Sequence, residues 1–208
     1  MHQKRQSTTT KLPITRKGTK YVARASSHLY NSVPVVIAIR DMLKLAKTLA
    51  EVKKMIKANL LKINGKNVKD YRESIKLFNI LEADKIYQLR MLPTKRFVFN
   101  ETKEKNKRVC KIINKKLLKN NKIQLNLHDG TNLITKDKIS VHDSVYLNLE
   151  GKIISSEKME KGKPIFVMSG KYAGKEGKID SIDKPNVLIK LSEKEEKVSL
   201  PKGNVIVL

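Results

Sequence analysis

The stretch from residue 33 to residue 84 constrains the fold most, because it contains two helical patterns with basic outer faces followed by a tight turn. In its first part apolar residues recur at the spacing of one helix face, which predicts a short amphipathic helix. The apolar positions are Val35, Ala38, Ile39, Met42, Leu43 and Ala46, and the opposite face carries Arg40, Asp41, Lys44 and Lys47. Thr48 followed by Glu51 has the form of a capping box and predicts the start of a second helix.

The second helix has a basic outer face. Its inward residues are Val52, Met55 and Ile56, and its outward residues are Lys53, Lys54 and Lys57. We expect it to end at Asn59, a residue type that tolerates the left-handed conformation at helix ends. Asn64-Gly65 then predicts a two-residue β-hairpin turn, because both residues accept positive φ.

This order of residues resembles the S4-type RNA-binding module, in which an Arg-Asp pair precedes a Ser/Thr-capped basic helix and an Asn-Gly hairpin. The matching residues are Arg40, Asp41, Thr48, Glu51, Lys53, Lys57, Ile63, Asn64 and Gly65. Leu49 stands where many members have Arg, and Asn59 replaces the usual Gly. The resemblance implies RNA binding by Arg40, Lys44, Lys47, Lys53, Lys54 and Lys57. Without the resemblance, the lysine stripe would suit a solvated helix face equally well.

The charge of the chain indicates the class of partner. Among 208 residues, 45 Lys and Arg stand against 20 Asp and Glu, a net charge of +25 that predicts a polyanionic partner, with nucleic acid as the first choice. A membrane surface is the rival polyanion, but we expect no membrane partner, because no apolar run of about eighteen residues and no signal peptide is present. The single cysteine, Cys110, excludes an internal disulfide and suits a reducing compartment.

Residues 1–32 are the most purely cationic segment, with seven basic and no acidic side chains. Few apolar residues are present, so we expect a disordered arm that folds on contact with RNA. A merely solubilising tail is the alternative. The candidate RNA-binding residues of the arm are Lys4, Arg5, Arg16, Lys17, Lys20 and Arg24.

The arm has a recognisable order of short motifs: His2-Gln3-Lys4-Arg5, then residues 12–17, then Lys20-Tyr21-Val22-x-Arg24 and Val33-Pro34. This order resembles the N-terminal region of the S4e family of archaeal and eukaryotic small-subunit ribosomal proteins. In that family a His-x-Lys-Arg box and a Trp-Pro-Ile-x-Arg-Lys segment precede the S4 module, and here Leu12 replaces the Trp.

Beyond residue 84 the pattern changes from helical to alternating, which predicts a small β domain over residues 85–160. Strands are expected near residues 86–91, 97–99 and 109–113, followed by a lysine-dense connector over residues 114–122. Ile123, Leu125 and Leu127 alternate with polar residues, and Asp129-Gly130 closes this strand with a turn. The run from Lys122 to Gly130 resembles the central core of the S4e family.

Three glycines mark the last segment, residues 161–208. The spacing of Gly170, Gly174 and Gly177 resembles the KOW motif, an element of a small SH3-like β-barrel. Glycine there permits positive φ and lets an RNA backbone approach closely. A simple β-turn is the alternative for the glycines alone. The resemblance adds Lys171, Tyr172, Lys175 and Lys178 to the candidate RNA-binding residues.

The sequence offers no catalytic, metal-binding or cofactor site. The glycines lack the spacing and the Ser or Thr of a phosphate-binding loop, and the four histidines lie far apart. His128 and Asp129 form a conceivable acid/base pair, but an Asp before Gly more simply stabilises a turn. We therefore expect no enzyme, no cofactor and no small-molecule substrate.

The expected fold class is α+β, made of an arm (1–32), an S4-type module (33–84), a central β domain (85–160) and a KOW barrel (161–208). The resemblance to the S4e family covers nearly the whole chain and implies a structural protein of the small ribosomal subunit in the cytoplasm. Its partners would be small-subunit ribosomal RNA and neighbouring ribosomal proteins. The alternatives are an RNA-modifying enzyme, for which about 75 remaining residues are too few, and a transcription elongation factor, which leaves the S4-type module unexplained.

Overall fold

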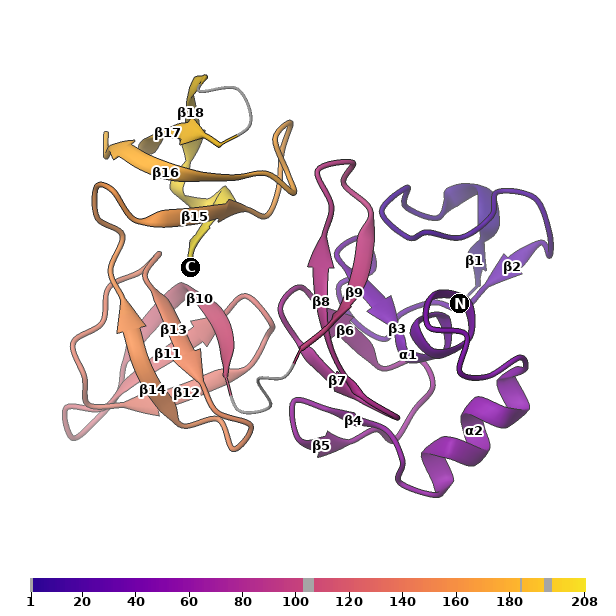
Figure 1. Ribbon diagram of the computed structural model, residues 1–208. Helices are drawn as coiled ribbons and strands as arrows, with labels where there is room; N and C mark the ends of the chain where they lie inside the picture. The colour runs from indigo at the N-terminus through magenta and orange to yellow at the C-terminus, as the bar shows by residue number, and fades with distance from the viewer. Residues whose placement is uncertain (1, 103–106, 184, 193–195) are drawn as a thin grey trace. The chain divides into compact units, whose positions relative to one another are not determined.

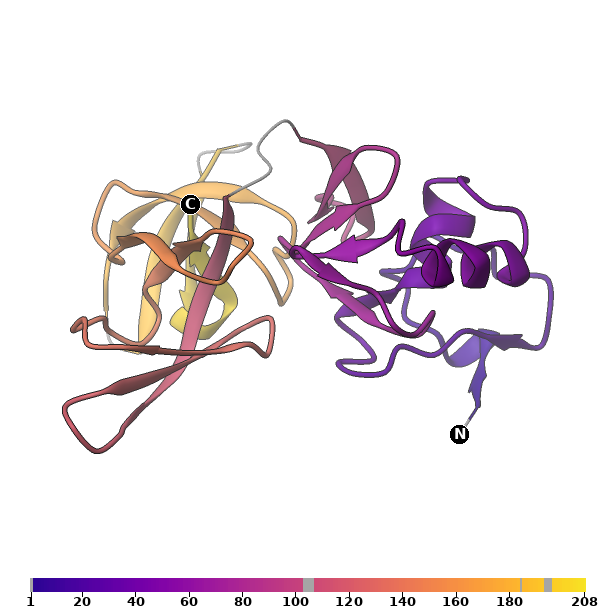
Figure 2. The same cartoon turned by 90° about the horizontal axis from the view of Figure 1, so that it is seen from below.

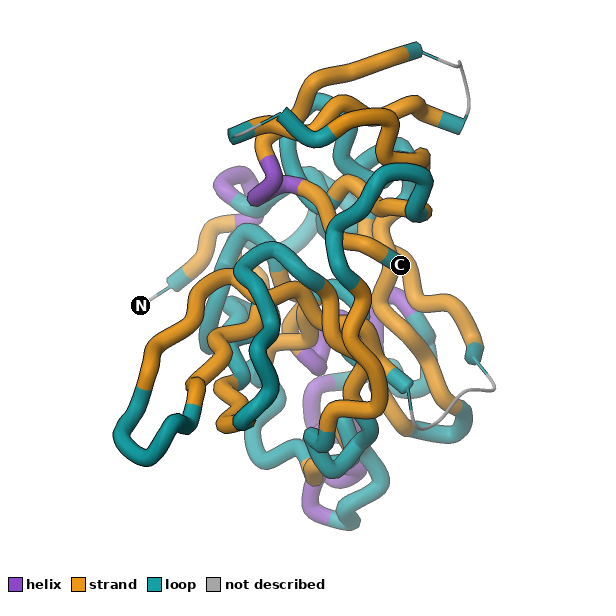
Figure 3. The backbone as a smooth tube through the Cα atoms, turned by 90° about the vertical axis from the view of Figure 1, so that its left-hand side faces the viewer, coloured by secondary structure: helices purple, strands orange, loops and turns teal. Residues whose placement is uncertain are grey.

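The protein is mostly β with few helices, as the tube in Figure 3 shows by the predominance of strands. The computed structural model describes residues 2–102, 107–183, 185–192 and 196–208. The chain divides into two compact units, residues 1–105 and 106–208, which are described in turn.

Among the described residues, the first unit contains both α-helices and three small antiparallel sheets (Figure 1). A five-stranded sheet has the order β5-β4-β7-β8-β9, while β1 pairs with β2 and β3 with β6. The strands are β1 (Gln3–Lys4), β2 (Tyr21–Val22), β3 (Ser32–Pro34), β4 (Lys62–Ile63), β5 (Lys66–Asn67), β6 (Ser74–Lys76), β7 (Ile80–Glu82), β8 (Ile86–Met91) and β9 (Phe97–Glu101). The helical elements are η1 (Arg5–Ser7), α1 (Val35–Ile37), η2 (Ala38–Met42) and α2 (Leu49–Lys57).

The first predicted helix is shorter and less regular than its pattern suggests. Only α1 is α-helical, and η2 continues it as a π-type turn in which the Leu43 amide donates to the Ala38 carbonyl at 2.9 Å. Lys44 then has a φ of 56°, which ends the helical path. Residues 33–39 are buried on every side rather than along one stripe, so tertiary packing decides their conformation.

The local signals around α2 are confirmed. The Glu51 amide donates to Thr48 Oγ1 at 3.3 Å, and the Glu51 carboxylate accepts from the Lys47 amide at 2.7 Å. Asn59 has a φ of 55°, as expected after a helix. Asn64 and Gly65, with φ values of 50° and 79°, make the turn between β4 and β5.

The arm of residues 1–32 was expected to be disordered, and its described part, residues 2–32, is instead folded onto the first unit. Leu12 and Ala25 are buried. The Lys11 carbonyl accepts from the Phe97 amide at 2.8 Å, and the Ser26 amide donates to the Arg72 carbonyl at 2.9 Å. Hydrogen bonds from backbone groups thus hold a segment that has too few apolar residues to fold alone.

The strands β8 and β9 belong to the first unit, whereas the sequence placed residues 85–101 in a separate central domain. β8 pairs with β7 along Ile80–Glu82, and the amides of Phe78 and Leu89 reach across to the carbonyls of Leu89 and Asn79 at 2.8 and 3.0 Å. Alternation alone identifies a strand but not its sheet, so the boundary near residue 105 had no sequence signal.

The second unit begins with a five-stranded antiparallel sheet of order β12-β11-β10-β13-β14. Its strands are β10 (Arg108–Leu117), β11 (Ile123–Leu127), β12 (Asn132–Thr135), β13 (Ser144–Leu147) and β14 (Ile153–Glu157). The first half of β10 pairs with β13 and the second half with β11, with a register shift between Ile112 and Asn114. Part of the predicted connector, residues 114–117, is therefore strand.

The C-terminal sheet has the order β18-β17-β16-β15-β19. Its elements are β15 (Pro164–Val167), β16 (Glu176–Ser181), β17 (Asn186–Leu191), β18 (Lys197–Pro201), η3 (Lys202–Asn204) and β19 (Val205–Val207). Gly170 and Gly174 have positive φ, as expected. At Gly177 a Cβ would lie 2.4 Å from the Lys190 carbonyl oxygen, so this glycine admits the backbone of β17.

Two buried basic side chains, Arg108 and Lys111, connect parts of the second unit. Arg108 forms a buried ion pair with Asp129, whose other oxygen accepts from the amide and the hydroxyl of Thr131 at 2.9 and 2.6 Å. Burial alone would raise the pKa of the Asp129 carboxyl, but the Arg108 charge and the Thr131 hydrogen bonds outweigh it and lower this pKa.

Lys111 on β10, 1% exposed, donates from Nζ to the carbonyls of Lys202 and Val205. It therefore ties the first sheet of the unit to the C-terminal one.

The burial of Lys111 predicts that the protein becomes more stable as the pH rises above neutrality. Burial lowers the pKa of its ammonium from 10.5 to about 8, because desolvation disfavours the charged form. Between these two values the unfolded chain binds more protons than the folded one, so the free energy of unfolding rises with pH. Relative to Lys111→Met, we expect the wild type to gain about 3 kcal/mol from about pH 7 to about pH 11 in urea denaturation. Burial lowers the pKa of nearby His142, so that imidazole stays neutral over this range. A difference independent of pH would contradict the assignment.

Candidate nucleic-acid interface

The outer face of α2 is an exposed row of lysines. Lys53, Lys54 and Lys57 are exposed, while Val52 on the opposite side is buried. Lys53 Nζ lies 5.3 Å from the centre of the Tyr71 ring, and the Arg72 guanidinium lies 5.1 Å from the same centre. This cluster presents cations beside an aromatic ring, the combination that binds phosphates and stacks on bases.

A groove of about 820 Å³ lies beside this cluster, within the first unit. Segments far apart in the sequence form its walls: the arm, the α1–η2 region, the start of α2 and the loop of residues 70–72. The groove thus brings Arg5 and Arg24 of the arm together with Arg40 and Arg72. Its acidic residues are Asp41 and Asp70, so the lining is basic but not uniformly so.

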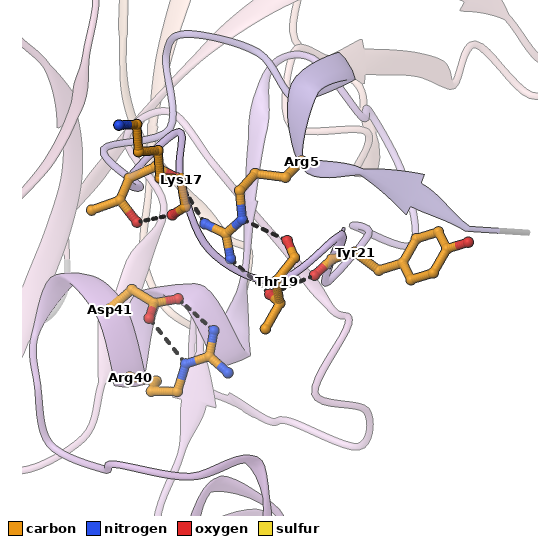
Figure 4. A network of polar contacts seen from close by, with 7 residues as sticks. Arg5, Lys17, Thr19, Tyr21, Arg40 and Asp41 are labelled. Atoms are coloured by element: carbon orange, nitrogen blue, oxygen red, sulfur yellow. Dashed lines mark hydrogen bonds and ion pairs between the residues drawn. The ribbon is translucent and has the colours of Figure 1, made fainter.

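Two of the predicted RNA-binding arginines are engaged inside the protein (Figure 4). Arg5 donates from Nε and Nη1 to the carbonyls of Thr19 and Thr15 at 2.8 and 2.7 Å, and from Nη2 to Thr19 Oγ1 at 2.8 Å. Arg40 donates to both carboxylate oxygens of Asp41, at 3.0 and 2.8 Å. These guanidinium groups hold the arm and the η2 turn in position, which sequence spacing alone could not reveal.

The other arm residues are placed more openly. Lys4, Lys17 and Lys20 are exposed, and Lys20 Nζ lies 5.5 Å from the Tyr21 ring centre. Arg16, also exposed, donates to the Thr8 carbonyl at 3.1 Å. Lys44 and Lys47 are likewise exposed next to η2 and the start of α2.

The predicted residues of the KOW segment lie in the second unit, around the turn between β15 and β16. Lys171 and Lys178 are exposed, and Lys175 is half-buried. Tyr172 packs partly against the apolar core of the C-terminal sheet, and its ring centre lies 5.6 Å from Lys171 Nζ. Tyr172 is therefore partly buried and contributes to this core.

Sequence reasoning missed Tyr71 and Arg72. They follow Asp70, whose carboxylate accepts from the Arg72 amide at 2.9 Å, and the Tyr71 hydroxyl accepts from Arg72 Nε at 2.9 Å. The only available signal was an aromatic residue next to an arginine in a polar loop, which is common at protein surfaces.

His128 and Asp129, the conceivable acid/base pair, both have structural roles. Asp129 is buried against Arg108 and Thr131, while His128 Nδ1 accepts from the Lys111 amide at 3.1 Å. The described residues contain no group of His, Cys, Asp and Glu that could hold a metal ion. Nor does any helix among them have the length and apolarity to span a membrane.

Comparison with known proteins gives consistent matches. The model of Ribosomal family S4e matches residues 83–154, and the KOW motif matches residues 161–190. The small ribosomal subunit protein eS4 of Methanocella arvoryzae is 34% identical over 188 residues, covering 87% of this chain and 80% of the relative. The eS4 protein of Archaeoglobus fulgidus is 32% identical over 187 residues, with the same two coverages. The crystal structure of 30S ribosomal protein S4e from Thermoplasma acidophilum aligns with a TM-score of 0.72 and 27% identity, covering 86% of this chain and 95% of that one.

Fold and matches together define a mostly β protein that carries a KOW motif. More particularly, the chain belongs to the S4e family of ribosomal proteins. This is a family of structural proteins and not of enzymes, which removes the RNA-modifying alternative. The KOW motif occurs here within the S4e arrangement, so it gives no support to an elongation factor.

The Arg5 contacts predict a specific effect on the arm. Arg5→Lys keeps the charge, but a single ammonium group cannot reach the three acceptors that the guanidinium group contacts. The guanidinium carbon also lies against Gly18, only 3.2 Å from the position that a Cβ would take there, and the smaller ammonium group leaves this space unfilled. We expect trypsin to cleave the arm about tenfold faster, because local opening costs about 1.4 kcal/mol less, while the melting temperature changes little. Arg16→Lys, which loses a single hydrogen bond, is the matched control. Equal cleavage of the two variants would show that Arg5 does not hold the arm.

Proposed function

We propose that the protein is a structural component of the small ribosomal subunit and binds small-subunit ribosomal RNA there, in the cytoplasm, beside neighbouring ribosomal proteins. The observation that carries the proposal is the similarity to eS4 proteins over most of both chains. The net charge of +25 agrees with it, because a cation of this size requires a polyanionic partner. Lysines that meet phosphates release counterions, which gives affinity without any chemical reaction.

Within this function, residues 33–84 act as an S4-type RNA-binding module. The supporting features are the Arg40–Asp41 pair before a Thr48-capped basic helix and the Asn64-Gly65 hairpin after it. The lysine face of α2 would follow the RNA backbone, and Tyr71 would offer a ring for stacking between two cations. Arg40 is better suited to positioning the η2 turn than to contacting a phosphate, because its Nε and Nη2 already donate to the Asp41 carboxylate.

Two further surfaces complete the proposal. The arm presents the exposed Lys4, Lys17 and Lys20, and its Arg24 lines the groove of the first unit. The turn after β15 presents Lys171, and the following strand β16 presents Lys178. Each surface belongs to a folded segment, so binding would fix segments of RNA rather than merely neutralise them.

The first test is sedimentation of a native cell extract at moderate and at high salt. We expect the chain to travel with the small ribosomal subunit at moderate salt. Because each phosphate contact steepens the fall of affinity with salt, retention after the high-salt wash would mean that contacts other than those to phosphates also hold the chain. Migration as free protein, or with other RNAs, would refute the ribosomal function.

The second test examines the lysine face of α2. Charge reversal of Lys53, Lys54 and Lys57 to Glu should weaken binding to small-subunit rRNA by about tenfold or more and lower the salt slope of log K by about 2 to 3. These side chains are exposed, so the melting temperature should hold. Reversal of Arg90, Lys95 and Arg96, exposed residues on β8 and in the turn before β9, makes the same charge change as a control. If the salt slope of log K did not change in the α2 variant, the lysines of α2 would be solvated residues that do not contact RNA.

A further inference from the structure

The paired ends of β10 and β11 form a projecting hairpin, here called the lysine finger (residues 113–127), which lay outside every predicted binding site. Figure 2 shows it extending past the other strands of its own unit. Residues 113–117 are exposed on both faces of the strand, unlike the buried first half of β10. The turn that joins the strands contains Asn120 and Asn121, with φ values of 61° and 54°.

The finger carries one sign of charge. Its lysines are Lys115, Lys116, Lys119 and Lys122, all exposed, and residues 113–127 include no Asp or Glu. None of the ion pairs found among the described residues involves any of these four lysines. Four lysines without local counter-charges repel one another, so the finger lowers its electrostatic energy when it meets a polyanion.

One face of the finger is also built for hydrogen bonding. The register of β10 and β11 places Asn114 opposite Asn126 and Lys116 opposite Gln124. In the neighbouring pair of β11 and β12, Asn126 lies opposite Asn132. Amide side chains therefore share one face of these three strands. Gln124 Nε2 donates to Asn126 Oδ1 at 3.0 Å, which orients that amide pair. Ile134, beside Gln124 on the same face, is 65% exposed.

Leu117 adds an apolar contact near the end of the finger. It is 75% exposed and lies opposite Ile123, which belongs to the core. Exposed lysines, orientable amides and isolated apolar side chains together match an RNA strand, which offers phosphates, 2′-hydroxyls and base faces at these separations. An acidic protein surface would match the lysines but would leave the amide row without a regular set of partners.

We propose that the lysine finger is a separate RNA-binding element that inserts along the backbone of small-subunit rRNA. Lys116, Lys119 and Lys122 contact phosphates, and the amides of Asn114, Gln124 and Asn126 contact sugar or base edges. The inference rests on the proposed ribosomal function and adds a contact surface to it.

The test uses the full chain and small-subunit rRNA in filter binding across a salt series. Changing Lys116, Lys119 and Lys122 to Ala should weaken binding by about tenfold and lower the salt slope by about 2 to 3, because about three phosphate contacts are lost. The matched control changes Lys152, Lys158 and Lys161 to Ala, three exposed lysines of the same unit. Equal losses in both variants would mean that only net charge matters and would overturn the proposal. A wild type that does not bind this rRNA at all would instead overturn the ribosomal function itself.

A second measurement places the finger directly. Asn120→Cys puts a thiol in the turn for attachment of an iron chelate, and the only native cysteine, Cys110, is 1% exposed with a thiol pKa raised by burial. Hydroxyl radicals generated there should cut the bound rRNA at a few discrete positions. Cleavage no greater than that of a protein labelled at Lys161→Cys would show that the finger does not approach RNA. Circular dichroism melts of all variants check that each remains folded.

Discussion

An excess of 25 positive charges is the constraint to which the rest of the structure conforms. With 45 basic and 20 acidic residues, most cations cannot find an internal partner and must stay in water. The apolar cores of the second unit are enclosed by antiparallel strands, and these cations lie outside them. Two of the buried cations have defined partners: Arg108 meets a carboxylate, and Lys111 meets two carbonyl oxygens.

The same constraint explains which basic residues hold the fold and which face outward. Arg5 and Arg40 use planar guanidinium groups to satisfy several acceptors at once, a geometry that a lysine cannot reproduce. The lysines of α2 and of the lysine finger, by contrast, are compact charges on flexible stems and are exposed. Arg5 and Arg40 thus contribute to the order of the first unit, whereas the lysines of α2 and of the lysine finger remain available to a partner.

Local features could be predicted from the sequence where one or two neighbouring residues decide the geometry. The Thr48 cap, the turn at Asn64-Gly65, the left-handed Asn59 and the Asp129 turn all follow from side-chain chemistry within four residues. Features that depend on distant partners could not be predicted. The ordered arm depends on contacts such as Lys11 with Phe97, Gly177 depends on Lys190, and Lys111 depends on Val205. The candidate site shares this limit, since the Tyr71 cluster and the groove bring separate segments together.

The sheet of the first unit bears on how such proteins can evolve. Residues 33–84 contribute β4, β5 and β7, but β7 is a central strand only because β8 and β9 continue the sheet beyond it. Leu89, Met91 and Phe97 on those two strands are buried in the same unit. A gene rearrangement that moved residues 33–84 alone into another protein would leave the β7 edge unpaired and its apolar face uncovered, a situation that favours aggregation. The stretch that folds together is therefore longer than residues 33–84 and extends to the end of β9.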